Sequence, residues 1–484
     1  MRERMIEPRQ VLVGLIVALW SLATTPAQAE LGVIDGITGT TFNLSAGEAR
    51  VSTPDGDSLL IWGYGPPGAP QYPGPTLIVN QGDLVTINLT NTDLPRATSI
   101  VFPGQGDDAA TPADESVTAI GGTCPGASGC PATELLTEEV AVGGGTVTYT
   151  FRATHAGTYM YHSGTNIELQ VEMGLFGAII VRPTGFNHAD RATRTAYGHP
   201  DSAYVSEYMY MMSEMDPVVH QMVDGGFYTD IDMTTYAPRL WFLNGRAAPD
   251  TLYYKSLAPY TQSVPWLPHQ PYNALPITHP GEKVLVRFLA ASHHIHPPHL
   301  HGNNWEEIAI DGRLLTTTPE DQGASGAGPD LSRSGNTLAT APLKTYDALW
   351  DWTGEDLGWD IYGTEADGLA HTCDGSTDPT PPSPGDPDLR FDSVSHEYCP
   401  DHGKSLPVVL PEFQDLMLGA FWSGTPFLGA LGDLPPGEGG LNIAGGLYHI
   451  WHSHSEVELV NNGVFPGGIL TFCVVLPRGV LPFP

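Results

Sequence analysis

Histidines are the residues of this chain with the clearest capacity for chemistry, and the densest group is the run HHIHPPHLHG at 293–302. In an extended strand alternate side chains share a face, so His299 and His301 are expected to point to one side. The proline pair before them interrupts strand pairing and lets His296 face elsewhere. Because imidazole binds copper, zinc and iron, the run predicts a metal site. The alternative is a polar surface loop.

A second cluster, YHIWHSH, ends at residue 454. His452 and His454 alternate around Ser453 and are expected to share a face, whereas His449 falls outside this pair. Taken alone, the pair is equally consistent with a structural role.

Carboxylates follow two of these histidines: Glu168 and Glu172 come after His162, and Glu456 and Glu458 come after His454. Turned inward, they would favour manganese or iron, or would deliver protons. Because the chain has 54 acidic residues against 20 basic ones, these carboxylates are expected to face water.

Five methionines lie in YVSEYMYMMSEMDPVVHQM, namely Met209, Met211, Met212, Met215 and Met222. Thioethers bind Cu(I). The alternation of this segment instead favours a core strand in which methionine fills gaps.

Short β-type segments position these residues, and helical periodicity is scarce. Residues 75–91 read as strand, turn and strand, with Gly82 and Asp83 in the turn, and further strands are expected at 145–153, 157–164 and 174–183. Strands of this kind, separated by Gly, Pro, Asn and Asp, predict an all-β sandwich or barrel.

The second half repeats this order at 278–292, 445–454 and 463–475. One β unit used twice predicts two domains, at 31–184 and 198–484. The second is too long for a bare sandwich, so we expect loop insertions at about 317–440. Within them, the aromatic residues of 340–363 suggest packing against the core.

The N-terminal residues 1–29 combine arginines, a short apolar run and a small-residue ending, which predicts a signal peptide; the alternative is a membrane anchor. We therefore expect a secreted, periplasmic or extracellular protein with no membrane span after cleavage. The net charge of −34 opposes binding to nucleic acid or anionic lipid.

Five cysteines fit such an oxidising compartment. Two local disulfides are predicted, Cys124 with Cys130 and Cys373 with Cys399. Cys473, in the apolar run ILTFCVV, is expected to be a buried, inert thiol.

The segments GTYMYHSG, GLFGAIIVRP, WFLNGRAAPDT, HPPHLHGNNWEEIAIDG and WHSH resemble, in this order, the multicopper oxidases and their two-domain laccases. The resemblance implies two cupredoxin-type Greek-key β-sandwich domains. It also implies copper ligands in four motifs: two of the form H-x-H, one H-P-x-H-L-H and one H-C-H-x-x-x-H.

This chain departs from the family pattern in three of the four motifs. Val101 and Pro103 stand where the first pair of histidines belongs, and Gly164 replaces the partner of His162. In the last motif Ser453, Glu458 and Gly463 replace the blue-copper cysteine, a histidine and the axial methionine. Without a thiolate no blue type 1 copper is expected.

The resemblance implies that five of the eight trinuclear-site histidines remain: His162, His299, His301, His452 and His454. His162 and His454 would share one copper, His301 and His452 another, with His299 at a third position. His296 would lie behind the ligands, or bind metal itself, together with Ser453 and Glu458.

We therefore expect an exported, multicopper-oxidase-like protein that binds one or two copper ions in a reduced type 2/type 3-like site. If it is an enzyme, it would be an oxidoreductase acting on a small-molecule reductant or metal ion. The alternatives are a non-catalytic structural or binding protein on a degenerate scaffold, and manganese or iron at the same histidines. The relatives also suggest a homotrimer in which His162 meets the other histidines across a subunit boundary.

Overall fold

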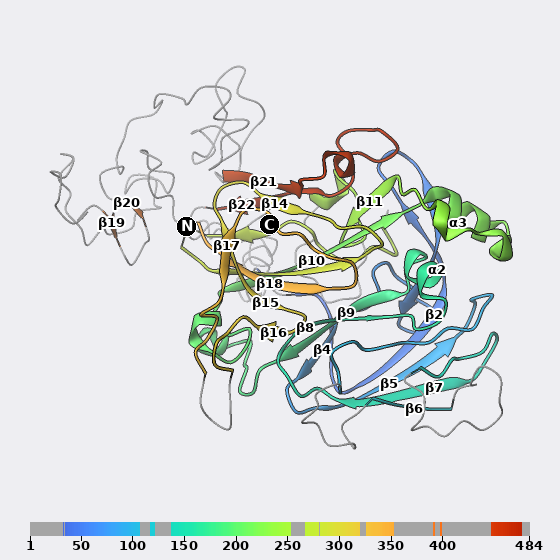
Figure 1. Cartoon of the computed structure of the whole chain (residues 1–484), viewed down its shortest axis with the longest axis horizontal. Helices are drawn as coiled ribbons and strands as arrows, with labels where there is room; N and C mark the ends of the chain where they lie inside the picture. Colours follow the sequence, from blue (N-terminus) through green and yellow to red (C-terminus); the bar gives the residue numbers. More distant parts are fainter. Residues whose placement is uncertain are drawn as a thin grey trace, which may run out of the picture. The chain divides into compact units, whose positions relative to one another are not determined.

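The predicted alternating and apolar segments form strands that assemble into four main sheets (Figure 1). The computed structural model describes residues 32, 34–106, 117–121, 137–252, 267–279, 281–319, 326–352, 391–392, 397–398 and 447–476. The predicted signal peptide, both predicted disulfides and most of the insertion at 317–440 lie outside these residues. Within the described residues, no helix has the length and apolar character needed to cross a membrane.

Two sheets pack together in the first half of the chain. One has the order β1 (Ile37–Thr38), β4 (Leu77–Asn80), β9 (Phe176–Arg182) and β8 (Gly157–His162). The other has the order β3 (Ser58–Gly65), β2 (Thr41–Ser52), β5 (Leu84–Asn91), β7 (Thr146–Arg152) and β6 (Thr118–Ile120). Their inward-facing residues, such as Val79, Ile87 and Tyr149, share one buried cluster.

A second pair of sheets follows. The larger has the order β11 (Leu240–Leu243), β10 (Ser206–Met215), β13 (Val284–Ala291), β18 (Thr345–Trp350), β15 (Trp305–Ile310) and β16 (Arg313–Leu314), with β17 (Arg333–Gly335) also on β15. The smaller has the order β12 (Ile277–Thr278), β22 (Leu470–Val475), β21 (Leu447–Ser453) and β14 (Pro298–Leu300). Phe288, Trp305 and Trp451 lie in their shared core.

Helices are short. The described residues contain the α-helices α2 (Ile167–Glu172) and α3 (Pro217–Asp224) and several short 3-10 helices, among them η10 (Glu456–Leu459). The two-residue strands β19 (Phe391–Asp392) and β20 (Glu397–Tyr398) pair only with each other. The described residues are therefore mainly β-strand and form two packed sheet pairs, as the predicted all-β sandwiches require. The strands of the two pairs fall within 31–184 and 198–484, which we retain as proposed domain boundaries.

Several side-chain predictions can be compared with this fold. Met211, Met212 and Met215 are buried in β10, so the core interpretation is confirmed for them, while Met222 lies on α3 instead. Cys473 is a buried free thiol, as predicted. The prediction that the carboxylates face water is wrong for Glu172 and Glu458, which are 3% and 4% exposed.

Those two carboxylates are buried because each has polar partners. Glu172 accepts hydrogen bonds from the Tyr236 hydroxyl at 2.8 Å and the Asp216 backbone N–H at 2.6 Å. Glu458 accepts one from His296 at 2.9 Å. Such bonds offset the cost of removing a carboxylate from water.

A buried ion cluster joins the two sheet pairs. Arg182 on β9 pairs with Glu207 on β10, and Arg287 on β13 lies 3.0 Å from the same carboxylate. Arg287 also donates to Thr158 on β8 at 2.7 Å, and that hydroxyl donates to Asp347 on β18. Tyr197 donates a further hydrogen bond to Asp347.

Charge pairing decides the ionisation of this cluster. Burial acts to raise the pKa of Glu207, but the guanidinium groups of Arg182 and Arg287 lower it to about 2. Burial raises the pKa of Asp347, against the opposing effect of Arg287. Removing one guanidinium would therefore leave a carboxylate buried without its main counter-charge.

We predict that Arg287→Met lowers the free energy of unfolding by about 3–5 kcal/mol, because the change breaks a buried ion pair. Equilibrium urea unfolding would measure the loss. Arg50→Met is the matched control, since Arg50 pairs with Asp224 at 2.6 Å on the surface with side chains 48% and 44% exposed. Surface pairs contribute about 0–1 kcal/mol. Equal losses in both variants would contradict the structural role given to the cluster.

Candidate metal centre

Four histidines gather where β14 and β21 pair. The two strands are antiparallel, with His299 directly opposite His452. The ladder continues beyond them, since the His301 N–H donates to the Ile450 carbonyl and the His454 N–H to the Pro297 carbonyl. Alternation then places His299, His301, His452 and His454 on the same face of the sheet.

The rings of these histidines, here called the four-imidazole cluster, are close to one another. The centroid of His299 lies 5.1, 5.3 and 4.6 Å from those of His301, His452 and His454. The Nε2 atoms of His301 and His452 are 3.4 Å apart. Ligand atoms of His299, His301 and His452 all lie within 4.8 Å of one another, which suits a shared ion.

Hydrogen bonds orient two of these rings. His452 Nδ1 lies 2.7 Å from the Ser453 carbonyl, so Nδ1 carries the hydrogen and Nε2 keeps its lone pair. His299 Nδ1 lies 2.8 Å from the Thr337 hydroxyl. Such partners fix ring orientation at metal sites. Nothing in the sequence around Thr337 signalled this contact, which tertiary packing alone creates.

The electrostatics keep His299, His301 and His452 uncharged near neutral pH. Burial, followed by the proximity of His301, His452 and His454, lowers the pKa of His299 to about 4. Burial also lowers the pKa of His301 and of His452. Neutral imidazoles are the form that binds metal ions.

His162 lies apart from the cluster. It ends β8 in the first sheet pair, its Nδ1 is 2.8 Å from the Ser163 carbonyl, and burial lowers its pKa. In the described part of the chain, no ring contact joins it to the other four histidines. Among the described residues, one chain therefore shows no ring contact between His162 and His454, and the copper that the resemblance assigns to both stays a prediction.

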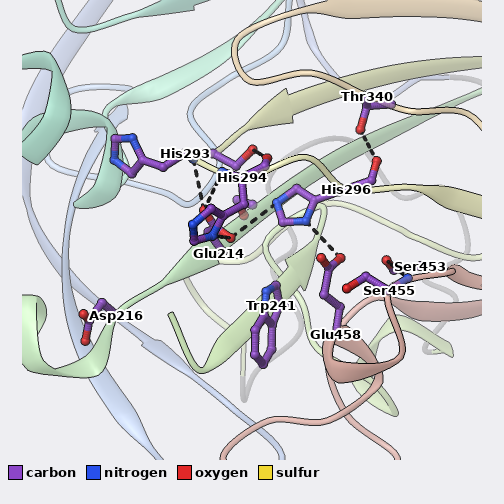
Figure 2. Close-up of polar contacts among 12 residues, drawn as sticks. Glu214, Asp216, Trp241, His293, His294, His296, Thr340, Ser453, Ser455 and Glu458 are labelled. Atoms are coloured by element: carbon purple, nitrogen blue, oxygen red, sulfur yellow. Dashed lines mark hydrogen bonds and ion pairs between the residues drawn. The ribbon is translucent and has the colours of Figure 1, made fainter. Parts of the chain in front are cut away.

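His296 faces a different set of partners, shown in Figure 2. Its ring is fully buried, Nδ1 is 2.9 Å from Glu458 Oε2, and Nε2 is 3.8 Å from Glu214 Oε2. The Ser453 hydroxyl accepts from the Ser455 N–H at 3.2 Å. A carboxylate thus contacts the imidazole at the position where the family pattern has a histidine ligand.

Sequence reasoning missed Glu214 and left His449 without a role. His449 is fully buried beside Trp350 and Trp352, and neither ring nitrogen has a hydrogen-bond partner. Burial, then the proximity of His301, lowers its pKa to about 3. It is a neutral imidazole packed behind the cluster.

Comparison with known proteins gives matches to part of this chain. The family model described as "Multicopper oxidase" matches residues 131–185. The curated "Multicopper oxidase MCE" of Talaromyces pinophilus is 36% identical over 113 residues, which is 23% of this chain and 15% of that protein. "Copper resistance protein A" of Pseudomonas syringae pv. tomato is 26% identical over 311 residues, which is 62% of this chain and 44% of that protein.

Among solved structures, the "Blue Copper Oxidase from Nitrosomonas europaea" aligns with a TM-score of 0.49 at 17% identity, covering 90% of this chain and 85% of that one. The matched regions span less than half of the length of either curated relative. By the family match and these curated relatives, part of this chain is similar to the multicopper oxidases.

Proposed function

We propose that this chain is an exported copper-binding protein whose four-imidazole cluster holds one or two copper ions in a reduced type 2/type 3-like site. The observation that carries the proposal is the convergence of three ligand atoms from His299, His301 and His452 within 4.8 Å. Likeness to multicopper oxidases implies copper as the cofactor, and imidazole donors suit copper.

The roles of the individual residues follow from their contacts. His301 and His452 would hold one ion between their Nε2 atoms, with His299 beside them and His454 at the exposed edge. Thr337 and the Ser453 carbonyl would hold the rings of His299 and His452 in place. Bound copper would supply one-electron redox chemistry.

A type 1 centre is not part of this proposal. Ser453 lacks the thiolate that such a centre requires, and the one free cysteine among the described residues is Cys473, buried in β22. If the protein is an oxidoreductase, a small-molecule reductant would have to deliver electrons to the cluster directly. We further propose a homotrimer in which His162 of one copy completes the cluster of the next.

The second candidate function is a non-catalytic binding or structural protein. It is favoured by the contact of His296 with Glu458, which replaces a position that the family uses for electron entry. Oxygen consumption with phenolic substrates, above that of free copper and lost in His301→Ala/His452→Ala, would exclude this candidate.

We predict that the purified protein, reconstituted with Cu²⁺ and desalted, retains one or two copper ions per chain without an intense blue absorption. The variant His301→Ala/His452→Ala should lose this copper, because it removes the two closest ligand atoms. His199→Ala/His279→Ala removes two imidazoles outside the cluster and serves as the control. Elemental analysis and electron paramagnetic resonance measure the outcome, and wild-type protein without copper above background would refute the proposal.

We predict that the cluster destabilises the metal-free protein as the pH falls. The pKa of His299 is about 4 in the folded chain, below its ordinary 6.5, so the unfolded chain binds more protons between these values. The free energy of unfolding should therefore decrease as the pH falls from about 6.5 towards about 4.

In His301→Ala/His452→Ala the pKa of His299 should rise, because two nearby imidazoles are removed, and the decrease in stability should be smaller. Nuclear magnetic resonance titration of the histidine rings, with urea unfolding at several pH values, tests both effects. An unchanged His299 titration in the variant would count against this account.

A further inference from the structure

The two segments that carry the four-imidazole cluster are acidic. Neither 293–312 nor 447–476 contains a lysine or an arginine, whereas together they contain five carboxylates: Glu306, Glu307, Asp311, Glu456 and Glu458. The whole chain has 54 acidic residues against 20 basic ones, so its long-range field has the same sign. A molecule that approaches the cluster from solvent therefore meets negative charge.

Glu456 brings one of these charges to the exposed edge of the cluster. It begins η10, two residues after His454, and both residues are exposed. Burial lowers the pKa of His452, and the Ser453 carbonyl and the Glu456 carboxylate act against that shift. The negative charge of Glu456 therefore reaches the imidazoles that would hold the ion.

Two basic side chains of the second sheet pair have carboxylates as neighbours. Lys344, which precedes β18, lies 2.9 Å from Asp311, and Arg333 on β17 stands directly opposite Glu307 on β15. The three imidazoles whose pKa is lowered are neutral near pH 7, so they add no positive charge. A cation is therefore attracted to the cluster, and an anion is repelled.

We propose that the four-imidazole cluster receives electrons from a cationic reductant, a transition-metal ion in its lower oxidation state, and not from an anionic organic molecule. This inference rests on the proposed function, because it requires Cu²⁺ at the cluster. One electron would pass from the reductant to Cu²⁺, and the reductant would leave with one more positive charge. No proton would move, and no covalent bond would form or break. A field of this sign raises the association rate of cations by a factor of about 10 to 10³.

Two inert complexes of similar size and opposite charge test this field in the metal-free protein. Hexaamminechromium(III) is a cation and hexacyanochromate(III) is an anion, and both broaden the nuclear magnetic resonance signals of nearby protons. We expect the cation to broaden the ring signals of His299 and His454 about ten times more than the anion does. Equal broadening by the two complexes would overturn the inference.

Glu456→Gln should reduce the broadening by the cation about two- to fivefold, because it removes one charge beside the cluster. Glu456 is exposed, so this variant is expected to fold. Asp93→Asn is the matched control, since it removes the same charge from an exposed position in the loop after β5, in the first sheet pair, and should leave the broadening unchanged. Equal reductions in the two variants would overturn the part given to Glu456.

Copper-loaded protein tests the electron transfer itself. With the cation hexaammineruthenium(II), the rate at which the Cu²⁺ paramagnetic resonance signal disappears should fall about tenfold as the ionic strength rises from about 0.01 M to about 0.15 M, since the screening length shortens from about 30 Å to about 8 Å. With ascorbate, an anion, the rate should rise. The reverse pattern with copper still bound would overturn this inference alone. Failure to retain copper would refute the proposed function, and the chromium measurement would still decide the charge preference.

Discussion

The buried ion cluster of Arg182, Glu207, Arg287 and Asp347 is the constraint on which the arrangement of this protein depends. It connects β9 of the first sheet pair with β10, β13 and β18 of the second. Glu207 and Arg287 lie on neighbouring parallel strands, so their pairing holds those strands in register. Ionic groups buried this deeply need specific partners, and a shifted register would leave them unpaired.

The same two strands lead to the residues of the candidate metal centre. Seven positions after Glu207, β10 presents Glu214, and β13 ends just before the run that contains every histidine from His293 to His301. One strand register therefore determines how Glu214 meets His294 and His296, and where β14 begins its pairing with β21. The geometry of the four-imidazole cluster thus depends on packing that lies several residues away from it.

Compared with the multicopper-oxidase motifs that this chain resembles, some histidine positions are kept and others are replaced. The paired histidines of β14 and β21 remain and still face one another across the ladder. At the position that the resemblance gives to blue copper, however, Glu458 hydrogen-bonds to His296, and this pair of side chains lacks the thiolate that a type 1 site requires.

The sequence alone was sufficient for the all-β fold and for the His-x-His pairs, because strand alternation is a local property that puts His299 and His301 on one face wherever the strand lies. It also identified His296 as facing elsewhere. Only the tertiary structure decided that His162 and His454 make no ring contact among the described residues, that Glu458 is buried, and that Glu214 approaches His296. Those outcomes depend on which strands become neighbours, and residues 82 positions apart leave no local pattern of their contact.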